Sequence, residues 1–449
     1  MPSPIQNLNL ASNSAITTAL TNLKGTYNGR NAWLNTSINK YIIDTSDEIK
    51  RDFVGGSINH PHMVNYLATS VFIHCFNGWS YLSGAISALM EGDYSNAIHN
   101  DYYSELRVIL SFLASQGIGV FNGNNIVVDR HGMAHEVFPK KKRTHDFANE
   151  AFDEWHTPPL NTDTFLKSFT IDSSTLHDWI GATGFSAEAP RELIAAKLKQ
   201  WSFDLTLLKK ENKFRNFVSY NPQCFDLSLV RKSDNIQERL NFVIDVWKLC
   251  GPNNLFANSI LRKSYETLYV SLFNMPLSEL KDDTDWKEIF TDLGKNPNDQ
   301  TSQSLIRFLT RQTNPNENLI FDYAESQRYS DPVLEIDTDP IGIISRACLI
   351  MLINTKIIET VLRQSGTSKE DLKFWFDNIG LKSGYWDAGA EPDLFSDLWI
   401  DVEIELGDIK RWIDNPATNF NPFNLKNNLK SSTTHIRSLG KACLWGIGL

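Results

Sequence analysis

The feature that most constrains the fold is a pair of long helical patterns separated by a two-residue break. From residue 62 to 91, apolar residues recur three and four positions apart, which predicts a helix of about 30 residues and roughly 45 Å. Pro61 suits the first turn of this helix and Gly92 suits its end. Asp93 can cap a second helix, whose apolar stripe ends at Leu113. The sequence therefore predicts two consecutive helices in this region.

The rest of the chain is helical in pattern except for one short stretch. The segments GIGVF and NIVVD flank an Asn-Gly-Asn turn, which predicts a short β-hairpin near 118–129. Residues 130–143 are expected to form a polar loop that ends in a basic run, Lys140 to Arg143. Thr144 can cap the next helix, which carries His145, Asn149 and Trp155. After Pro158-Pro159 the pattern is helical nearly to the end. We therefore predict an all-α protein, a multi-helix bundle with one short β-hairpin.

The length of 449 residues exceeds the roughly 100 to 200 residues of a usual domain. We predict an N-terminal helical cap over 1–59 and a histidine-rich helical region over 60–160. A C-terminal helical domain is expected over 161–449. Asn- and Pro-rich stretches make 294–330 a place where this last domain could divide.

Composition excludes several classes of protein. The net charge of -10 argues against sequence-blind binding to duplex DNA, which depends on many lysines and arginines that neutralise phosphates. The five cysteines are far apart in sequence and form no CxxC pair, so we expect reduced core thiols. The most apolar stretch, 341–362, contains charged residues, which predicts a buried helix rather than a membrane span. With no signal-peptide pattern at the start, we expect a cytoplasmic protein without membrane contact.

Histidine is concentrated in one part of the sequence. Eight of the ten histidines lie between residues 60 and 156. His99, Tyr103 and Arg107 stand four residues apart on one flank of the second predicted helix, so they are neighbours on its surface. Together with His145 they offer a cation, titratable rings and a phenol, which suits the binding of a phosphate or nucleotide. The alternative is that these side chains only cover the edge of the core.

The segment from Gly92 to Ile118 resembles the core helix of HEPN domains, a family of small helical bundles. In that family, small residues and a Tyr-Tyr pair precede an apolar helix that ends in Gly-Ile. The matching features here are Ala97, Tyr102-Tyr103, Leu106, Leu113-Ala114 and Gly117-Ile118. The resemblance covers about a hundred residues, 60–156, and implies a helical bundle that binds or processes RNA.

The resemblance also implies a catalytic pair. HEPN proteins that are metal-independent ribonucleases carry an arginine followed, four to six residues later, by a histidine. Arg130 and His135 have this spacing. The resemblance implies that Arg130 holds the scissile phosphate and that His135 moves the proton of the attacking 2′-hydroxyl. The motif follows a predicted strand and contains Gly132, whereas the family places it at the start of a helix, so the alternative is a pair of loop residues that face water.

Neither a metal nor a cofactor is expected. His131 and His135 have the spacing of metal ligands on one helix face, but Gly132 between them favours a loop. The chain also lacks the glycine-rich and nucleophile motifs of nucleotide-binding proteins and hydrolases.

Two functional hypotheses follow. The first is a bacterial-type RNA-processing or RNA-binding protein of stress response or anti-phage defence; if it is an enzyme, it is a metal-independent endoribonuclease. The second is a non-enzymatic helical scaffold that binds a partner protein of the same system, with Trp386 as a contact if it is exposed in its Gly/Pro-flanked loop. A homodimer is compatible with both.

Overall fold

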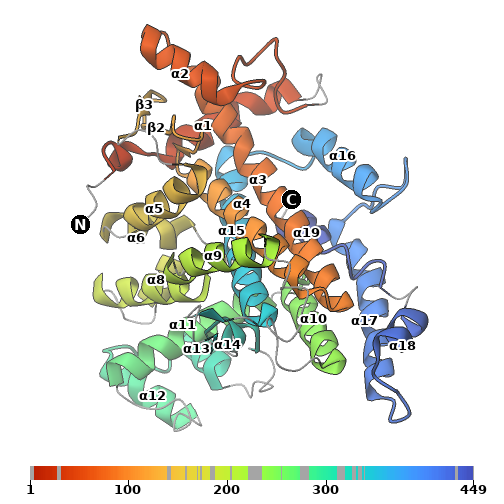
Figure 1. Ribbon diagram of the computed structural model, residues 1–449. Helices are drawn as coiled ribbons and strands as arrows, with labels where there is room; N and C mark the ends of the chain where they lie inside the picture. Colours follow the sequence, from red (N-terminus) through yellow and green to blue (C-terminus); the bar gives the residue numbers. More distant parts are fainter. Residues whose placement is uncertain are drawn as a thin grey trace.

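The fold was obtained as a computed structural model that describes most of the chain. The described residues are 5–27, 32–138, 143–156, 159–168, 170–171, 174–182, 188–202, 205–220, 235–253, 255–273, 283–310, 319–325, 330–331, 336–337, 339–429 and 433–447. Cys224 and residues 140–142 of the predicted basic run lie outside them. Most of the described chain is helical, which confirms the predicted all-α class (Figure 1).

The two predicted consecutive helices are present as α3 (His60–Glu91) and α4 (Tyr94–Ser115). Gly92 ends α3 with φ +78°, a backbone angle that glycine adopts without strain. The Asp93 side chain then accepts a hydrogen bond from the backbone N–H of Asn96, 3.1 Å away, and caps α4. The two helices run antiparallel and pack along their length.

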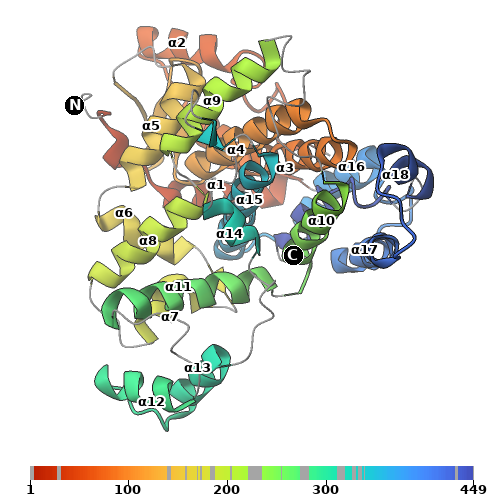
Figure 2. The ribbon, with the colours of Figure 1, turned by 60° about the horizontal axis from the view of Figure 1, so that its bottom comes forward.

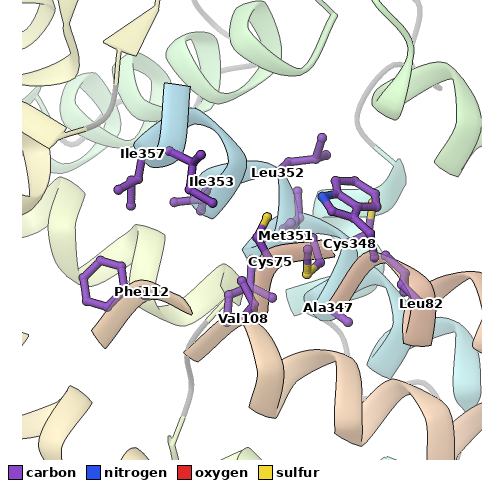
Figure 3. Packing of buried hydrophobic residues seen from close by; sticks show 14 of the residues in the cluster. Cys75, Leu82, Val108, Phe112, Ala347, Cys348, Met351, Leu352, Ile353 and Ile357 are labelled. Atoms are coloured by element: carbon purple, nitrogen blue, oxygen red, sulfur yellow. The ribbon is translucent and has the colours of Figure 1, made fainter. Parts of the chain in front are cut away.

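A helix from the far end of the sequence completes this core. Helix α15 (Pro340–Ser365) packs against both α3 and α4, and its apolar side chains meet theirs in the centre of the molecule (Figure 3). Trp79 of α3 donates from Nε1 to Thr355 Oγ1 at 3.0 Å, and Asn354 donates to Ser111 Oγ of α4 at 3.0 Å. Within the described residues α15 is the one helix long and apolar enough to cross a membrane, and 94% of its most apolar window is buried inside the protein. The helix is therefore a core helix, as predicted.

The remaining helices surround these three in the arrangement that Figures 1 and 2 show. The N-terminal ones are α1 (Asn13–Tyr27), α2 (Thr45–Gly55), α5 (Thr144–His156), α6 (Pro159–Ser168), α7 (Leu176–Ala182), α8 (Glu188–Ser202) and α9 (Leu205–Tyr220). The C-terminal ones are α10 (Ile236–Cys250), α11 (Leu255–Phe273), α12 (Asp283–Asp292), α13 (Gln300–Thr310), α14 (Leu319–Glu325), α16 (Lys373–Ser383), α17 (Trp399–Asp414), α18 (Pro422–Asn428) and α19 (Lys441–Gly446).

The predicted hairpin is the first part of a three-stranded antiparallel sheet. Strands β1 (Ile118–Gly119), β2 (Ile126–Val128) and β3 (Ala134–Glu136) lie in that order, with Val127 opposite His135. The third strand corrects the prediction of a loop over the whole of 130–143. Two further strand pairs, β4 (Thr170–Ile171) with β5 (Ser174–Thr175) and β6 (Ser330–Asp331) with β7 (Ile336–Asp337), are only two residues long per strand.

The cysteines in the described part of the chain are buried free thiols, as predicted: Cys75, Cys250, Cys348 and Cys443. Although far apart in sequence, Cys250 and Cys348 bring their Sγ atoms to 3.6 Å and join α10 to α15. Burial raises the pKa of the Cys250 thiol, which keeps it protonated and unreactive.

Gly78 of α3 lies against the Met351 side chain of α15. A Cβ atom at this position would lie 2.7 Å from Met351 Sδ. We expect Gly78→Val to lower the free energy of unfolding by about 1 to 3 kcal/mol, because overpacking forces neighbours out of place. Chemical denaturation measures the change. Met351→Ala in the same chain should restore part of the loss.

The matched control is Gly407→Ala in α17, where nothing lies within 4 Å of an added Cβ atom. This change should be neutral or slightly stabilising, since alanine is the better helix former. Equal losses at the two glycines would contradict the close packing of α15 on α3.

Candidate phosphate-binding site

Arg215 of α9 lies over two tyrosines of α4, the helix that α9 crosses in Figure 2. Its guanidinium carbon is 4.6 Å from the ring centroid of Tyr102 and 5.5 Å from that of Tyr103. Both distances are those of a cation–π contact. We refer to Arg215 with His99, Tyr102, Tyr103 and His145 as the arginine cluster.

The charge of Arg215 has no acidic partner in the described part of the chain. The side chain is only 8% exposed, and its Nη2 donates to Asn212 Oδ1 at 3.1 Å. Its Nε atom is buried and makes no hydrogen bond there. A buried charge is costly unless it is paired, so an anion that reached this guanidinium would be bound favourably.

Two histidines of the arginine cluster each use one ring nitrogen for a hydroxyl contact. His99 Nδ1 lies 2.9 Å from Ser219 Oγ of α9, and His145 Nδ1 lies 2.6 Å from Tyr102 OH. Both rings are half-buried. Because Nδ1 is occupied, Nε2 is the nitrogen that each ring can offer to a ligand.

Burial, followed by the positive charge of Arg215, lowers the pKa of His99 and of His145. Burial raises the pKa of Tyr102 to about 12, against the opposing influence of Arg215. At neutral pH the two histidines are therefore mostly uncharged, and Tyr102 is a neutral phenol. Arg215 supplies the positive charge of the cluster.

A second arginine, Arg107, lies on α4 one helical turn beyond Tyr103. Arg107 donates from Nη1 to His74 Nδ1 of α3 at 3.3 Å. Burial and the Arg107 charge lower the pKa of His74 to about 3, so the contact joins a cation to a neutral ring. Between the two arginines, Tyr103 stacks on Tyr81 of α3 with centroids 5.4 Å apart.

The predicted set of four residues is thus divided by the structure. His99, Tyr103 and His145 gather around Arg215, whereas Arg107 pairs with His74. Sequence reasoning missed Arg215 because no local motif marks it: the contact between α4 and α9 joins residues 120 positions apart. Tyr102, which the sequence marked as part of the Tyr-Tyr pair of the HEPN resemblance, is both buried and bonded to His145.

Arg130 of the Arg130–His135 motif lies on the tight turn between β2 and β3, and His135 is the middle residue of β3. His135 Nε2 is 2.8 Å from Asp129 Oδ2, and Arg130 donates from Nε to His131 Nε2 at 3.1 Å. Arg130 is exposed and His135 is half-exposed. The two side chains of the motif therefore come from the turn and from the strand that follows it, and each has a different neighbour as its hydrogen-bond partner.

Asp129 organises this turn. Its Oδ1 accepts hydrogen bonds from the backbone N–H groups of His131 at 2.9 Å and Met133 at 3.0 Å, and Gly132 turns the chain with φ +76°. Burial acts to raise the pKa of Asp129, but the hydrogen bonds from His135 and the backbone outweigh it, and the pKa is lowered. Asp129 is therefore a carboxylate that holds the His135 ring by Nε2, so that Nδ1 is the ring nitrogen outside this contact.

Within the described ranges, no three or more His, Cys, Asp and Glu side chains are grouped so that they could hold a metal ion. Trp386 corrects one expectation, because it is half-buried rather than exposed. Its indole rests directly on Gly380 of α16 and stacks with Phe395, centroids 6.0 Å apart.

Comparison of the chain with known protein families, with curated proteins and with solved structures finds no match.

Proposed function

We propose that the protein binds RNA, and that the arginine cluster holds a phosphate of the RNA. The observation that carries the proposal is the buried guanidinium of Arg215, which lacks a carboxylate within 4 Å in the described residues. Arginine binds phosphate oxygens through charge-assisted hydrogen bonds. A phosphate would supply the missing negative charge.

The surroundings of Arg215 support a nucleic acid over a simple anion. Tyr81 and Tyr103 are half-buried, so part of each ring is accessible beside the cation. Single-stranded nucleic acid is held by such a combination of cations and aromatic faces, because phosphates pair with the former and bases stack on the latter. The HEPN resemblance supports RNA as the polymer. The net charge of -10 favours local recognition of a single strand over broad contact with a duplex.

The test is the binding of a fluorescently labelled single-stranded RNA, measured by anisotropy. Arg215→Met removes the charge and keeps most of the side-chain volume. We expect it to weaken binding at least tenfold, since a hydrogen bond to a charged group contributes about 1.5 to 3 kcal/mol and 1.4 kcal/mol is about tenfold. Duplex DNA should bind weakly at physiological salt.

The matched control is Arg437→Met. Arg437 lies on the surface, 42% exposed, and pairs with Glu91 at 2.8 Å, so its loss should leave RNA binding unchanged. Circular dichroism confirms that each variant is folded. Equal affinity of the wild type and the Arg215 variant would refute the proposal and favour the scaffold hypothesis.

A second candidate function is RNA cleavage at the turn between β2 and β3, and the contact of Asp129 with His135 favours it. In this scheme His135 Nδ1 takes the proton of a 2′-hydroxyl, and the 2′-oxygen attacks the adjacent phosphorus. The bond from phosphorus to the 5′-oxygen breaks, and the 5′-oxygen takes a proton from water. The products are a 2′,3′-cyclic phosphate and a 5′-hydroxyl. Arg130 is exposed on the same turn and can neutralise the phosphate charge.

A further inference from the structure

The arginine cluster combines one nearly buried cation with two histidines that are half-buried. Arg215 is almost fully buried, while the two histidines beside it are half-buried. The two rings are therefore more exposed than the guanidinium. Tyr102 and Tyr103 lie beneath the guanidinium.

Building on the RNA-binding function, we propose that the ligand of the arginine cluster is a terminal phosphate, a phosphomonoester, and that its binding is coupled to proton uptake by His99 or His145. The proposal concerns the chemistry of the group that is bound. An RNA end and a free nucleotide both carry it.

The depth of Arg215 favours a chain end. An internal phosphodiester continues in two directions, so two flanking nucleotides would have to be accommodated beside a nearly buried guanidinium. A phosphomonoester continues in one direction only and can reach a guanidinium that is 8% exposed. Its extra oxygen also allows a bidentate contact with two nitrogens of the guanidinium.

The charges favour the same ligand. A phosphomonoester carries close to two negative charges at neutral pH, because its second pKa is about 6, whereas a diester carries one. Arg215 balances one of them. His99 and His145 can balance the other, because each can present a protonated Nε2 to an oxygen while Nδ1 keeps its hydroxyl contact.

Proton uptake follows from the neighbours of the two rings. Burial and Arg215 lower the pKa of both in the free protein, while Asp146 of α5 acts on His145 in the opposite direction. The negative charge of Glu105, also on α4, acts to raise the pKa of Tyr102. A bound phosphate neutralises Arg215 and adds negative charge, so the histidine pKa values rise on binding. Affinity is therefore expected to fall as the pH rises through the pKa values of the bound state.

The experiment is isothermal titration of the full chain at pH 7 in two buffers of different protonation enthalpy. The probes are a 5′-phosphorylated hexauridylate, the same oligonucleotide with a 5′-hydroxyl, one with a 3′-phosphate, and uridine monophosphate. We expect a phosphorylated end to bind at least tenfold more tightly than the hydroxyl form, with net proton uptake. The double variant His99→Asn, His145→Asn keeps a side-chain nitrogen near each Nδ1 position and should lose the uptake and most of the preference.

The outcomes separate the two proposals. Equal binding of phosphorylated and hydroxyl oligonucleotides through Arg215, without proton uptake, overturns the terminal-phosphate inference and leaves RNA binding intact. Uridine monophosphate that binds as tightly as the phosphorylated oligonucleotide supports the inference and overturns RNA as the ligand. Absence of binding by every probe overturns both. Uptake that persists in the double histidine variant overturns the assignment of the protons to His99 and His145.

Discussion

Replacement of His135 by alanine is expected to lower the rate of RNA cleavage by about 100- to 10,000-fold, the usual contribution of a general acid or base. His135 is the side chain whose ring Asp129 holds at 2.8 Å, with Nδ1 directed away from that contact. The measurement is cleavage of a labelled single-stranded RNA in the presence of EDTA, with analysis of the ends for 2′,3′-cyclic phosphate. Cleavage by the wild type should survive the chelator, because the proposed reaction uses side chains alone.

Two companion variants show whether His135 acts in the chemistry. Asp129→Asn should reduce the rate by less than His135→Ala, because the amide can still contact the ring while the carboxylate charge is lost. His131→Ala serves as the matched control, since this histidine lies exposed on the same turn and contacts Arg130 instead. Cleavage that His135→Ala leaves unchanged, but that Arg215→Met abolishes, would move the reaction to the arginine cluster.

The turn variants are not expected to unfold the protein. His135 is half-exposed and its strand position faces Val127, so its loss removes one hydrogen bond and little apolar area. The turn itself depends more on Asp129, whose Oδ1 accepts two backbone hydrogen bonds. Thermal unfolding of the His135 variant should therefore resemble that of the wild type, which separates a loss of activity from a loss of structure.

The parts of the fold that depend on local patterns could be predicted from the sequence. The period of apolar residues and the caps at Gly92 and Asp93 predicted α3 and α4 almost to their ends. The apolar run with internal charges predicted α15 as a core helix. In each case the physical cause lies within the segment, namely one buried face and a residue that can end or begin a helix.

The strand β3 could not be predicted because its three residues, Ala134 to Glu136, show no strand pattern of their own. They are extended because they pair with β2, and the turn before them is fixed by Asp129 and Gly132. Strand formation of this kind depends on a partner more than on intrinsic preference.

Only the part of the candidate site that depends on local spacing could be predicted from the sequence. His99 and Tyr103 could be placed together from their helical spacing, and His145 could be suspected from its residue type. Arg215 belongs to a helix whose sequence, LTLLKKENKFRNFVSY, resembles any solvated amphipathic helix. Only the packing of α9 on α4 distinguishes this cation from the lysines near it.

Trp79→Ala is expected to cause the largest loss of stability, about 3 to 5 kcal/mol in the free energy of unfolding, because a fully buried indole leaves a cavity that its neighbours fill only partly. Trp79 lies in the layer where α3 meets α15, and its Nε1 donates to Thr355 at 3.0 Å. Urea denaturation followed by both fluorescence and circular dichroism measures the change and shows whether the transition is cooperative.

A second variant separates the contribution of the Trp79 hydrogen bond from the contribution of its packing. Thr355→Val keeps the side-chain volume but leaves the Trp79 N–H without this acceptor, which should cost about 1 to 3 kcal/mol. Trp386→Ala is the control for loss of an indole, since Trp386 is half-buried and packs at the edge of the fold on α16. Its cost should be clearly smaller than that of Trp79→Ala. Equal losses in the free energy of unfolding for the two tryptophan variants would contradict the packing of α15 on α3 around Trp79. Another helix would then have to complete the core.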